Sequence, residues 1–326
     1  MTDIDTSTTY NSLYELLEAF PDEESCVRHL EAIRWPGGII CAFCGSKRKI
    51  YRVTRKHVYK CADCKKQFSV RKDTIFEESR LPLRKWFIAA WLVTSHRKGI
   101  PSTQLAREIG VTQKTAWFML GRLREVWGQL DDGDGPVGGE VEVDETFIGG
   151  KEGNKHANKK LRLGRGTAGK QPVAGARSRE GKVKVKAVSD TSRIKLHEFV
   201  RSNIAIGSTL YTDENRAYYG LEDDYDHETV NHSVGEYVKG QAHTNSLESF
   251  WALLKRGYIG TFHHFTWKHL HRYLAEFSAR FNLGKGKGGW RVDTMLGATP
   301  GLRLTYAELI EELPGSEEAI GEETDG

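Results

Sequence analysis

Four cysteines in two close pairs constrain the N-terminal part of this chain more than any other feature. Cys41 and Cys44 form one Cys-x-x-Cys pair, Cys61 and Cys64 form the second, and 16 residues separate the two pairs. Two such pairs at this spacing are typical of a tetrahedral zinc site made of four thiolates. Because sulfur fills all four positions, the predicted zinc site is structural and leaves no place for a catalytic water. The alternative is two pairs of buried, reduced cysteines.

Charge is unevenly distributed along the chain. The net charge is only +4, but residues 47–98 hold 16 Lys or Arg against four acids, whereas residues 1–31 and 307–326 are acidic. A basic block indicates a polyanionic partner such as nucleic acid, although a solvated charged surface has the same composition. The basic residues between the cysteine pairs that we expect to contact DNA phosphates are Lys47, Arg48 and Lys49.

The sequence contains no candidate membrane span or secretion signal. A bilayer-spanning helix needs about 20 consecutive apolar residues, and no such run occurs. The first residues, MTDIDTSTTY, lack a basic region followed by an apolar run. We therefore expect a cytoplasmic protein without a membrane partner, associated with the nucleoid when it is bound to DNA.

Changes in local pattern predict a multidomain α+β chain. The predicted order is an acidic helical segment (1–35), a zinc ribbon (36–75), a helical region with a helix-turn-helix (76–130), a Gly- and Asp-rich linker (131–140), a catalytic domain (141–285) and a Gly-rich, then acidic, C-terminal tail (286–326). Three strands followed by alternating helices and strands favour a mixed α/β sheet with helices on its faces, as in ribonuclease H-like domains.

Hydrophobic periodicity places the individual elements. The predicted helices are 82–97, two helices within 102–127, and then 194–204, 243–257 and 267–281. The predicted strands outside the ribbon include 140–148, two strands around the turn at Glu180-Gly181, 208–214 and 228–233. Residues 151–170 are basic, glycine-containing and without periodicity, which predicts a mobile loop that could clamp DNA.

Residues 102–123 have the pattern of a helix-turn-helix. Ala106 is small where two helices must approach closely, Gly110 marks the turn, and Thr112 is suited to cap the second helix. An ordinary helical hairpin would carry the same pattern. The side chains predicted to be exposed and to contact DNA are Gln113, Lys114, Thr115 and Arg122.

Three acids lie where phosphoryl-transfer chemistry needs them. Asp144 lies in the predicted strand EVEVDETFI, Asp213 ends the strand LYTD, and Glu248 lies at the edge of the apolar stripe of the helix NSLESFWALLKRGY. Lys255 follows two turns later, within roughly 20° of Glu248 around the helix. Carboxylates of this kind hold two Mg²⁺ or Mn²⁺ ions, which bind the attacking and leaving oxygens of a phosphate displacement. The predicted catalytic residues are Asp144, Asp213, Glu248 and Lys255.

Each of these acids alone also has a structural interpretation. Asp213 could cap the following turn, and the neighbouring acids Glu142, Glu145 and Glu214 compete for the same roles. The three positions taken together, on a strand, at a strand end and at a helix edge, favour the catalytic interpretation.

Several segments together identify a family resemblance. VEVDETFIGGK, YTDENRAYYGL, AHTNSLESFWALLKRGYIGTFHHF and HRYLAEFSARFN resemble the zinc-ribbon insertion-sequence transposases of the DDE type, which carry an ISXO2-like transposase domain. The resemblance covers about residues 35–283. It implies a ribonuclease H-like fold, an Asp-Asp-Glu triad at Asp144, Asp213 and Glu248, and Lys255 as the following basic residue. Some relatives carry Asn at the third position, which keeps Asn245 as an alternative. Glu248 is preferred because a neutral amide binds magnesium more weakly.

The resemblance also implies partners and an activity. The expected partner is double-stranded DNA, at transposon ends and at the target, bound by a homodimer or a larger assembly on paired ends. The expected activity is metal-dependent cleavage and strand transfer after binding to terminal inverted repeats. The alternative is a DNA-binding regulator or domesticated remnant that does not cut. A plain nuclease of the same fold would only hydrolyse DNA.

Overall fold

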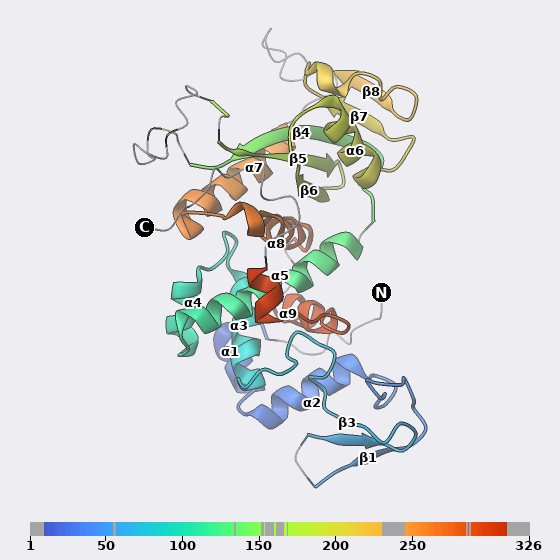
Figure 1. Cartoon of the computed structure of the whole chain (residues 1–326), viewed down its shortest axis with the longest axis vertical. Coiled ribbons are helices and arrows are strands. Elements are labelled where there is room, and N and C mark those ends of the chain that lie inside the picture. The colour runs from blue at the N-terminus through green and yellow to red at the C-terminus, as the bar shows by residue number, and fades with distance from the viewer. Residues whose placement is uncertain are drawn as a thin grey trace. The chain divides into compact units, whose positions relative to one another are not determined.

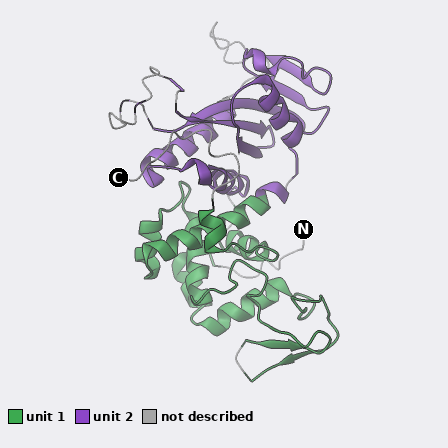
Figure 2. Cartoon of the chain, in the orientation of Figure 1, with its two compact units in different colours: residues 1–130, 285–311 green, residues 131–284, 312–326 purple. Residues whose placement is uncertain are grey.

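The computed structural model describes most of the chain as two compact units (Figure 2). Unit 1 consists of residues 1–130 and 285–311, and unit 2 of residues 131–284 and 312–326. No helix in the part of the chain that the structure describes is both long and apolar enough to cross a membrane. The described residues are 10–54, 57–133, 135–150, 153, 160, 166, 167, 169–229, 245–284, 286 and 288–311.

Unit 1 combines helices with a small antiparallel sheet (Figure 1). Its helices are α1 (Leu13–Ala19), α2 (Glu23–Arg34), α3 (Leu83–Ser95), α4 (Ser102–Ile109), α5 (Gln113–Gly133), α9 (Gly288–Gly297) and α10 (Tyr306–Ile310). Its sheet has the order β1 (Ile50–Arg52), β2 (Tyr59–Cys61) and β3 (Gln67–Phe68). The last turn of α5 extends into the region predicted to be a linker.

The C-terminal part of unit 1 differs from the predicted Gly-rich tail. Gly288 starts helix α9 and is buried, and a Cβ atom there would lie 2.4 Å from the Trp91 ring. On the same helix, Asp293 accepts hydrogen bonds from the Tyr10 hydroxyl at 2.9 Å and the His29 imidazole at 2.7 Å. The glycine therefore permits close helix packing. Because Tyr10 and Asp293 are 283 residues apart, local pattern could not reveal this contact.

Unit 2 is built around a mixed five-stranded sheet. Its strands are β4 (Glu140–Ile148), β5 (Gln171–Ser178), β6 (Val183–Ala187), β7 (Thr209–Thr212) and β8 (Asp226–Thr229), in the order β6-β5-β4-β7-β8. The pairs β4–β5 and β5–β6 are antiparallel, whereas β4–β7 and β7–β8 are parallel. Its helical elements are α6 (Arg193–Asn203), η3 (Arg216–Tyr218), α7 (Asn245–Gly257), η5 (Tyr258–Phe262), η6 (Trp267–His269) and α8 (Leu270–Asn282).

Two hydrophobic clusters cover opposite faces of this sheet. Val141 and Val143 of β4 pack with α6 residues such as Phe199, on one face. Val183 and Val185 of β6 pack with residues of α7 and α8 on the other face. Side chains alternate along a strand, so Glu142 and Asp144 face α7. This mixed sheet with helices on both faces is consistent with the predicted ribonuclease H-like domain.

The predicted elements of unit 2 mostly match the structure. The expected strand 140–148 is β4, and the expected helix 194–204 is α6 to within one residue. The strand expected at 228–233 begins two residues earlier, at Asp226, and residues 230–233 lie outside the described part. Most of the expected basic loop at 151–170 also lies outside it.

Candidate active site and metal centre

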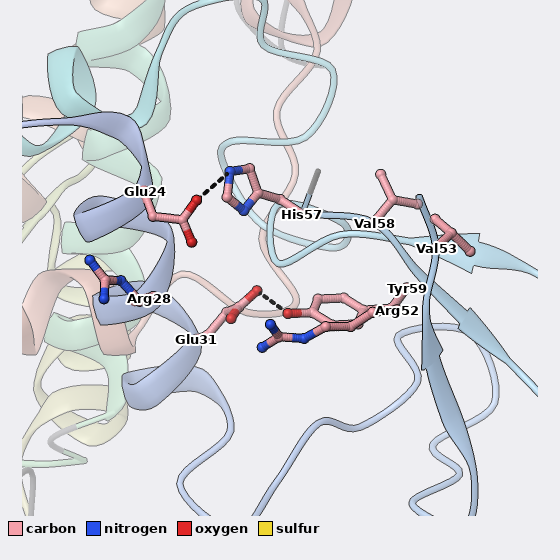
Figure 3. A pocket seen from close by; sticks show the side chains of 8 residues that line it. All are labelled: Glu24, Arg28, Glu31, Arg52, Val53, His57, Val58 and Tyr59. Carbon is pink, nitrogen blue, oxygen red and sulfur yellow. Dashed lines mark hydrogen bonds and ion pairs between the residues drawn. The ribbon is translucent and has the colours of Figure 1, made fainter. Parts of the chain in front are cut away.

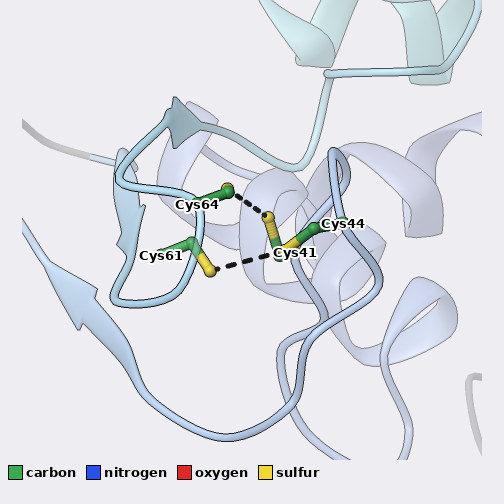
Figure 4. Close-up of side chains that lie close together, drawn as sticks. All are labelled: Cys41, Cys44, Cys61 and Cys64. Carbon is green, nitrogen blue, oxygen red and sulfur yellow. Dashed lines mark hydrogen bonds between the residues drawn. The ribbon is translucent and has the colours of Figure 1, made fainter.

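The four paired cysteines lie together at one end of the ribbon (Figure 4). Their sulfur atoms all lie within 4.8 Å of one another; Cys41 and Cys64 are 3.6 Å apart, and Cys44 and Cys61 are 3.7 Å apart. Among the described residues, they form the single group of three or more potential ligands at such distances. The predicted clustering is confirmed, and four sulfurs that converge in this way are consistent with a structural zinc site.

Equivalent turns hold the two cysteine pairs. The Cys41 N–H donates to the carbonyl of Ser46, and the Cys61 N–H donates to the carbonyl of Lys66, in each case five residues further on. The residue after each second cysteine has a positive φ: +69° at Gly45 and +61° at Lys65. Hydrogen bonds and backbone conformation within each loop therefore determine the geometry of its cysteine pair.

The pKa values of Cys41 and Cys44 are shifted in opposite directions. Burial raises the pKa of Cys41, but the N–H groups of Phe43 and Cys44 and the neighbouring thiols lower it, to about 7 overall. For Cys44, burial and the neighbouring thiols outweigh the Ser46 N–H and raise the pKa to about 12. Zinc binds thiolates, so a lowered thiol pKa in the cluster favours metal binding.

A polar pocket of about 220 Å³ lies between α2 and the β1–β2 hairpin (Figure 3). The Tyr59 hydroxyl donates to Glu31 at 2.6 Å, and His57 lies 3.4 Å from Glu24. These contacts attach the hairpin to α2, so the pocket belongs to the ribbon. Its lining residues are Glu24, Arg28, Glu31, Arg52, Val53, His57, Val58 and Tyr59.

The predicted helix-turn-helix has the expected local geometry. Helix α4 ends at Gly110 in the left-handed region, with φ +62°, and the Val111 N–H donates to the Ala106 carbonyl. The Thr112 hydroxyl accepts from the Thr115 N–H at 3.2 Å and so caps α5. The side chains of Gln113 and Lys114 are exposed, and Thr115 is half-buried. Lys47, Arg48 and Lys49 are exposed as well.

Arg122 differs from the prediction that placed it among the exposed DNA contacts. Its side chain is only 5% exposed. The guanidinium donates to the backbone carbonyls of Leu304, Ile75 and Glu77 at 2.7–2.9 Å. It also lies over the Phe118 ring. Arg122 therefore ties α5 to two distant loops, because the helix face it occupies is covered by a segment near the C-terminus that the local pattern did not include.

Parallel pairing between β4 and β7 places two of the predicted acids side by side. Glu142 pairs with Tyr211; Asp144 lies two residues further along β4, and Asp213 directly follows Thr212, the last residue of β7. Neighbouring strands lie about 4.8 Å apart, and laterally paired residues point to the same face. The Asn215 N–H donates to Asp213 at 3.0 Å, so the turn-capping role that we considered for Asp213 is present too.

The Asp144 carboxylate is half-buried on the α7 face of the sheet. Its Oδ2 accepts a 2.9 Å hydrogen bond from the Trp251 indole N–H. Burial is the main cause that raises the pKa of Asp144, to about 6. The Trp251 N–H opposes this shift, and the charges of Glu145 and Asp213 add to it. A carboxylate held near like charges in this way favours a bound cation.

The competing acid Glu145 is engaged on the opposite face. One carboxylate oxygen accepts from the Asn215 amide at 2.7 Å, and the other accepts from the Tyr218 hydroxyl at 2.5 Å. Burial raises the pKa of Glu145, while these two donors oppose the shift. Glu145 thus holds the segment that follows Asp213 against β4.

The competing acid Glu142 caps helix α7. It is 1% exposed and accepts from the Leu247 N–H at 3.0 Å, from Arg179 at 2.8 Å and from the Ser246 hydroxyl. Arg177 adds a hydrogen bond to the Ser249 hydroxyl at 3.0 Å. An acid at a helix N-terminus satisfies free N–H groups and interacts favourably with the helix dipole.

Helix α7 carries the remaining predicted residues. Two hydrogen bonds between α7 and β4 flank Glu248. The Leu247 N–H donates to Glu142 just before it, and the Trp251 indole N–H donates to Asp144 three residues after it. The side chains of Glu248 and Lys255 are exposed. Glu248 does not join the sheet acids in a group at ligand distance. Asn245 begins α7, and its side chain lies outside the described part of the structure.

Sequence reasoning missed two functional features of this site. It gave no functional role to Trp251 or to Gly175. Gly175 pairs with Asp144, and a Cβ atom there would lie 2.5 Å from the Trp251 ring. A glycine inside a strand often marks the close approach of another group, and that was the available signal.

Comparison with known proteins gives the family. The model of the ISXO2-like transposase domain matches residues 136–282, and the model of the transposase zinc-ribbon domain matches residues 21–67. A protein in the transposable element ISH50 of Halobacterium salinarum is 31% identical over 302 residues, which cover 86% of this chain and 98% of that relative. The chain belongs to the ISXO2-like transposase family. The match to the transposase domain runs from β4 to α8 and therefore includes every strand of the unit 2 sheet.

The zinc-ribbon match of this family member includes all four clustered cysteines. It begins at residue 21 and therefore includes helix α2, whereas the predicted ribbon began at residue 36. The contacts of Glu24 and Glu31 with the hairpin explain why α2 and the ribbon form one piece.

Proposed function

We propose that this chain is a DDE transposase that binds the terminal inverted repeats of an insertion sequence and catalyses metal-dependent phosphodiester hydrolysis and strand transfer. The observation that supports the proposal is the parallel pairing of β4 with β7: Asp144 lies in β4, Asp213 follows the end of β7, and helix α7, which bears Glu248, contacts β4. Membership of the ISXO2-like family and the relative within a transposable element support it.

The residues of the site fit divalent cations. Carboxylate oxygens are the ligands that Mg²⁺ and Mn²⁺ prefer, and burial near Asp213 and Glu145 makes an anionic Asp144 costly without a cation. Asp144, Asp213 and Glu248 would hold the ions. Two ions bound there supply Lewis-acid stabilisation of the attacking and leaving oxygens. Glu248 is exposed, and the proposal requires its side chain to turn toward the sheet when the ions bind.

Other residues of the chain would bind the DNA. Lys255 lies two helical turns after Glu248 and would contact a phosphate beside the reacting bond. Gln113, Lys114 and Thr115, at the start of α5, would face base edges. Lys47, Arg48 and Lys49 would contact phosphates from the ribbon, whose shape the zinc maintains. We further propose that two or more copies assemble on paired transposon ends.

The test uses purified protein, Mg²⁺ and a labelled duplex that carries the element's terminal repeat. Wild type is compared with Asp144→Asn, Asp213→Asn and Glu248→Gln, and with Glu214→Gln as a matched control at an exposed neighbouring acid. Loss of several kcal/mol of charge stabilisation predicts rates on the order of 1,000-fold lower for the three site variants, with DNA binding retained. Asn245→Ala decides between the two candidates for the third ligand.

Two results would contradict the proposal. Tight binding of the repeat without metal-dependent cutting by wild type would favour the non-catalytic regulator. Cutting without joining of the end to target DNA would favour a plain nuclease. If Asn245→Ala stops cleavage and Glu248→Gln does not, the third ligand is Asn245.

A further inference from the structure

Trp251 has one polar atom, and that atom is directed at the central carboxylate of the proposed active site. The side chain is 4% exposed, and its indole N–H donates to Asp144 Oδ2 at 2.9 Å. Indole nitrogen is a donor only, so Trp251 cannot itself be a metal ligand. The indole N–H occupies one lone pair of Oδ2, and the carboxylate also interacts with the Glu145 backbone N–H, so the indole is one of its two hydrogen-bond restraints.

The sheet is shaped to receive this indole. Gly175 lies directly beside Asp144 in the neighbouring strand, and a Cβ atom there would lie 2.5 Å from two carbons of the Trp251 ring and 3.3 Å from Val185. Any other residue at this position would push the ring away from the strand. Because Gly175 has no side chain, the Trp251 ring can approach β5 closely enough for its N–H to reach Asp144.

The helix that carries the indole is held independently. Glu142, two residues before Asp144, accepts from the Leu247 N–H, one turn before Trp251. Helix α7 is thus attached to β4 at its first turn, and the indole hydrogen bond is a second attachment one turn later. Loss of the indole N–H would leave the helix in place and remove one restraint on the orientation of the Asp144 carboxylate.

We propose that Trp251 is a positioning residue: it fixes the Asp144 carboxylate in the orientation that binds divalent cations, and Gly175 is the position that makes this contact possible. The proposal rests on the proposed function, because it assumes that Asp144 is a metal ligand. Hydrogen bonds that orient metal ligands typically change metal affinity or activity by about 10–100-fold.

The test compares Trp251→Phe, which keeps an aromatic ring but lacks the N–H, with Trp267→Phe, a control at a partly exposed indole. Binding of Mn²⁺ to the zinc-loaded full chain is measured by the electron paramagnetic resonance of the free ion, with Asp144→Asn to identify the site. We expect Trp251→Phe to bind Mn²⁺ about 10-fold more weakly and to need more Mg²⁺ for half-maximal cleavage. Terminal-repeat binding, the unfolding midpoint and the Trp267→Phe values should stay near wild type.

The result that overturns the proposal is unchanged Mn²⁺ affinity and Mg²⁺ dependence in folded Trp251→Phe. If that variant does not fold, replacement of Trp251 by benzothienylalanine keeps the bicyclic shape without the N–H, and unchanged Mn²⁺ binding there overturns it equally. Failure of the proposed function looks different. In that case wild type and Asp144→Asn bind Mn²⁺ alike, and the positioning role falls with it.

Discussion

The cysteine site of unit 1 and the carboxylate site of unit 2 are assembled in contrasting ways. The four cysteines lie within 24 residues, and each pair is shaped by hydrogen bonds inside its own loop. The proposed ligands Asp144, Asp213 and Glu248 span 105 residues, and their positions depend on the parallel pairing of β4 with β7 and on two contacts between α7 and β4. One site is a local structure, and the other depends on the whole domain.

The contrast extends to energetics. A structural zinc site contributes binding free energy directly to folding, because the ligands converge only in the folded state. The carboxylate site opposes folding, since burial and like charges raise the pKa of Asp144 to about 6. We therefore expect damage to the first site to unfold its unit, and damage to the second to affect chemistry and stability in opposite directions.

The largest expected effect is loss of a zinc ligand. Cys61→Ser should release the metal and unfold the ribbon, because structural zinc contributes about 10–16 kcal/mol to such domains. Zinc content and far-ultraviolet circular dichroism would show this. Cys26→Ser is the matched control, because Cys26 is buried outside the cluster, and it should keep its zinc. Normal zinc content in Cys61→Ser would contradict the four-sulfur site.

The next effect tests the attachment of α7. Glu142→Ala removes the helix cap and one partner of Arg179, and should cost about 2–4 kcal/mol of unfolding free energy, since Arg179 keeps some access to water. Denaturant titration measures the change. Glu140→Ala removes a second, more exposed partner of the same arginine, 3.4 Å away, and should cost less than about 1 kcal/mol. Equal losses would mean that the cap is unimportant.

A smaller effect, of opposite sign, is expected at Asp144. The folded pKa of about 6 lies above the ordinary 3.8, so ionised Asp144 destabilises the fold as pH rises from about 4 through 6. Without added Mg²⁺ or Mn²⁺, Asp144→Asn should raise the unfolding free energy at pH 7 by up to roughly 3 kcal/mol. The gain should shrink toward pH 4, while Glu214→Gln changes stability little at either pH. A destabilised Asp144→Asn protein at pH 7 would contradict the electrostatic cost.

The smallest expected effect distinguishes Lys114, a proposed DNA contact, from Arg122, a cation with a structural role. Lys114→Ala, at an exposed site, should leave stability within about 0.5 kcal/mol and lower the salt dependence of terminal-repeat binding by about one ion. Fluorescence anisotropy at several salt concentrations measures that slope. Arg122→Ala should instead destabilise unit 1, because three buried carbonyls lose their donor. An unchanged slope in Lys114→Ala would remove that residue from the DNA interface.

Local chemistry made some features of this protein predictable. Cysteine spacing indicated the sulfur cluster, and Gly110 with Thr112 indicated the turn and cap between α4 and α5. Alternation of apolar residues placed β4 and its acidic residues correctly. These features depend on backbone conformation and on contacts within a few residues, which a sequence pattern records directly.

Long-range packing was required for the rest. Arg122 is buried because residues near 304 cover it, and α9 is ordered because Trp91 and Tyr10 pack against it. Likewise, Glu142, Glu145 and Asp144 are alike in the sequence but became a helix cap, a partner of Tyr218 and a candidate metal ligand. The sequence determined which charged groups and hydrogen-bond donors are present. Strand register and helix docking determined which of these groups contact one another, because contacts between residues far apart in the chain form only in the folded domain.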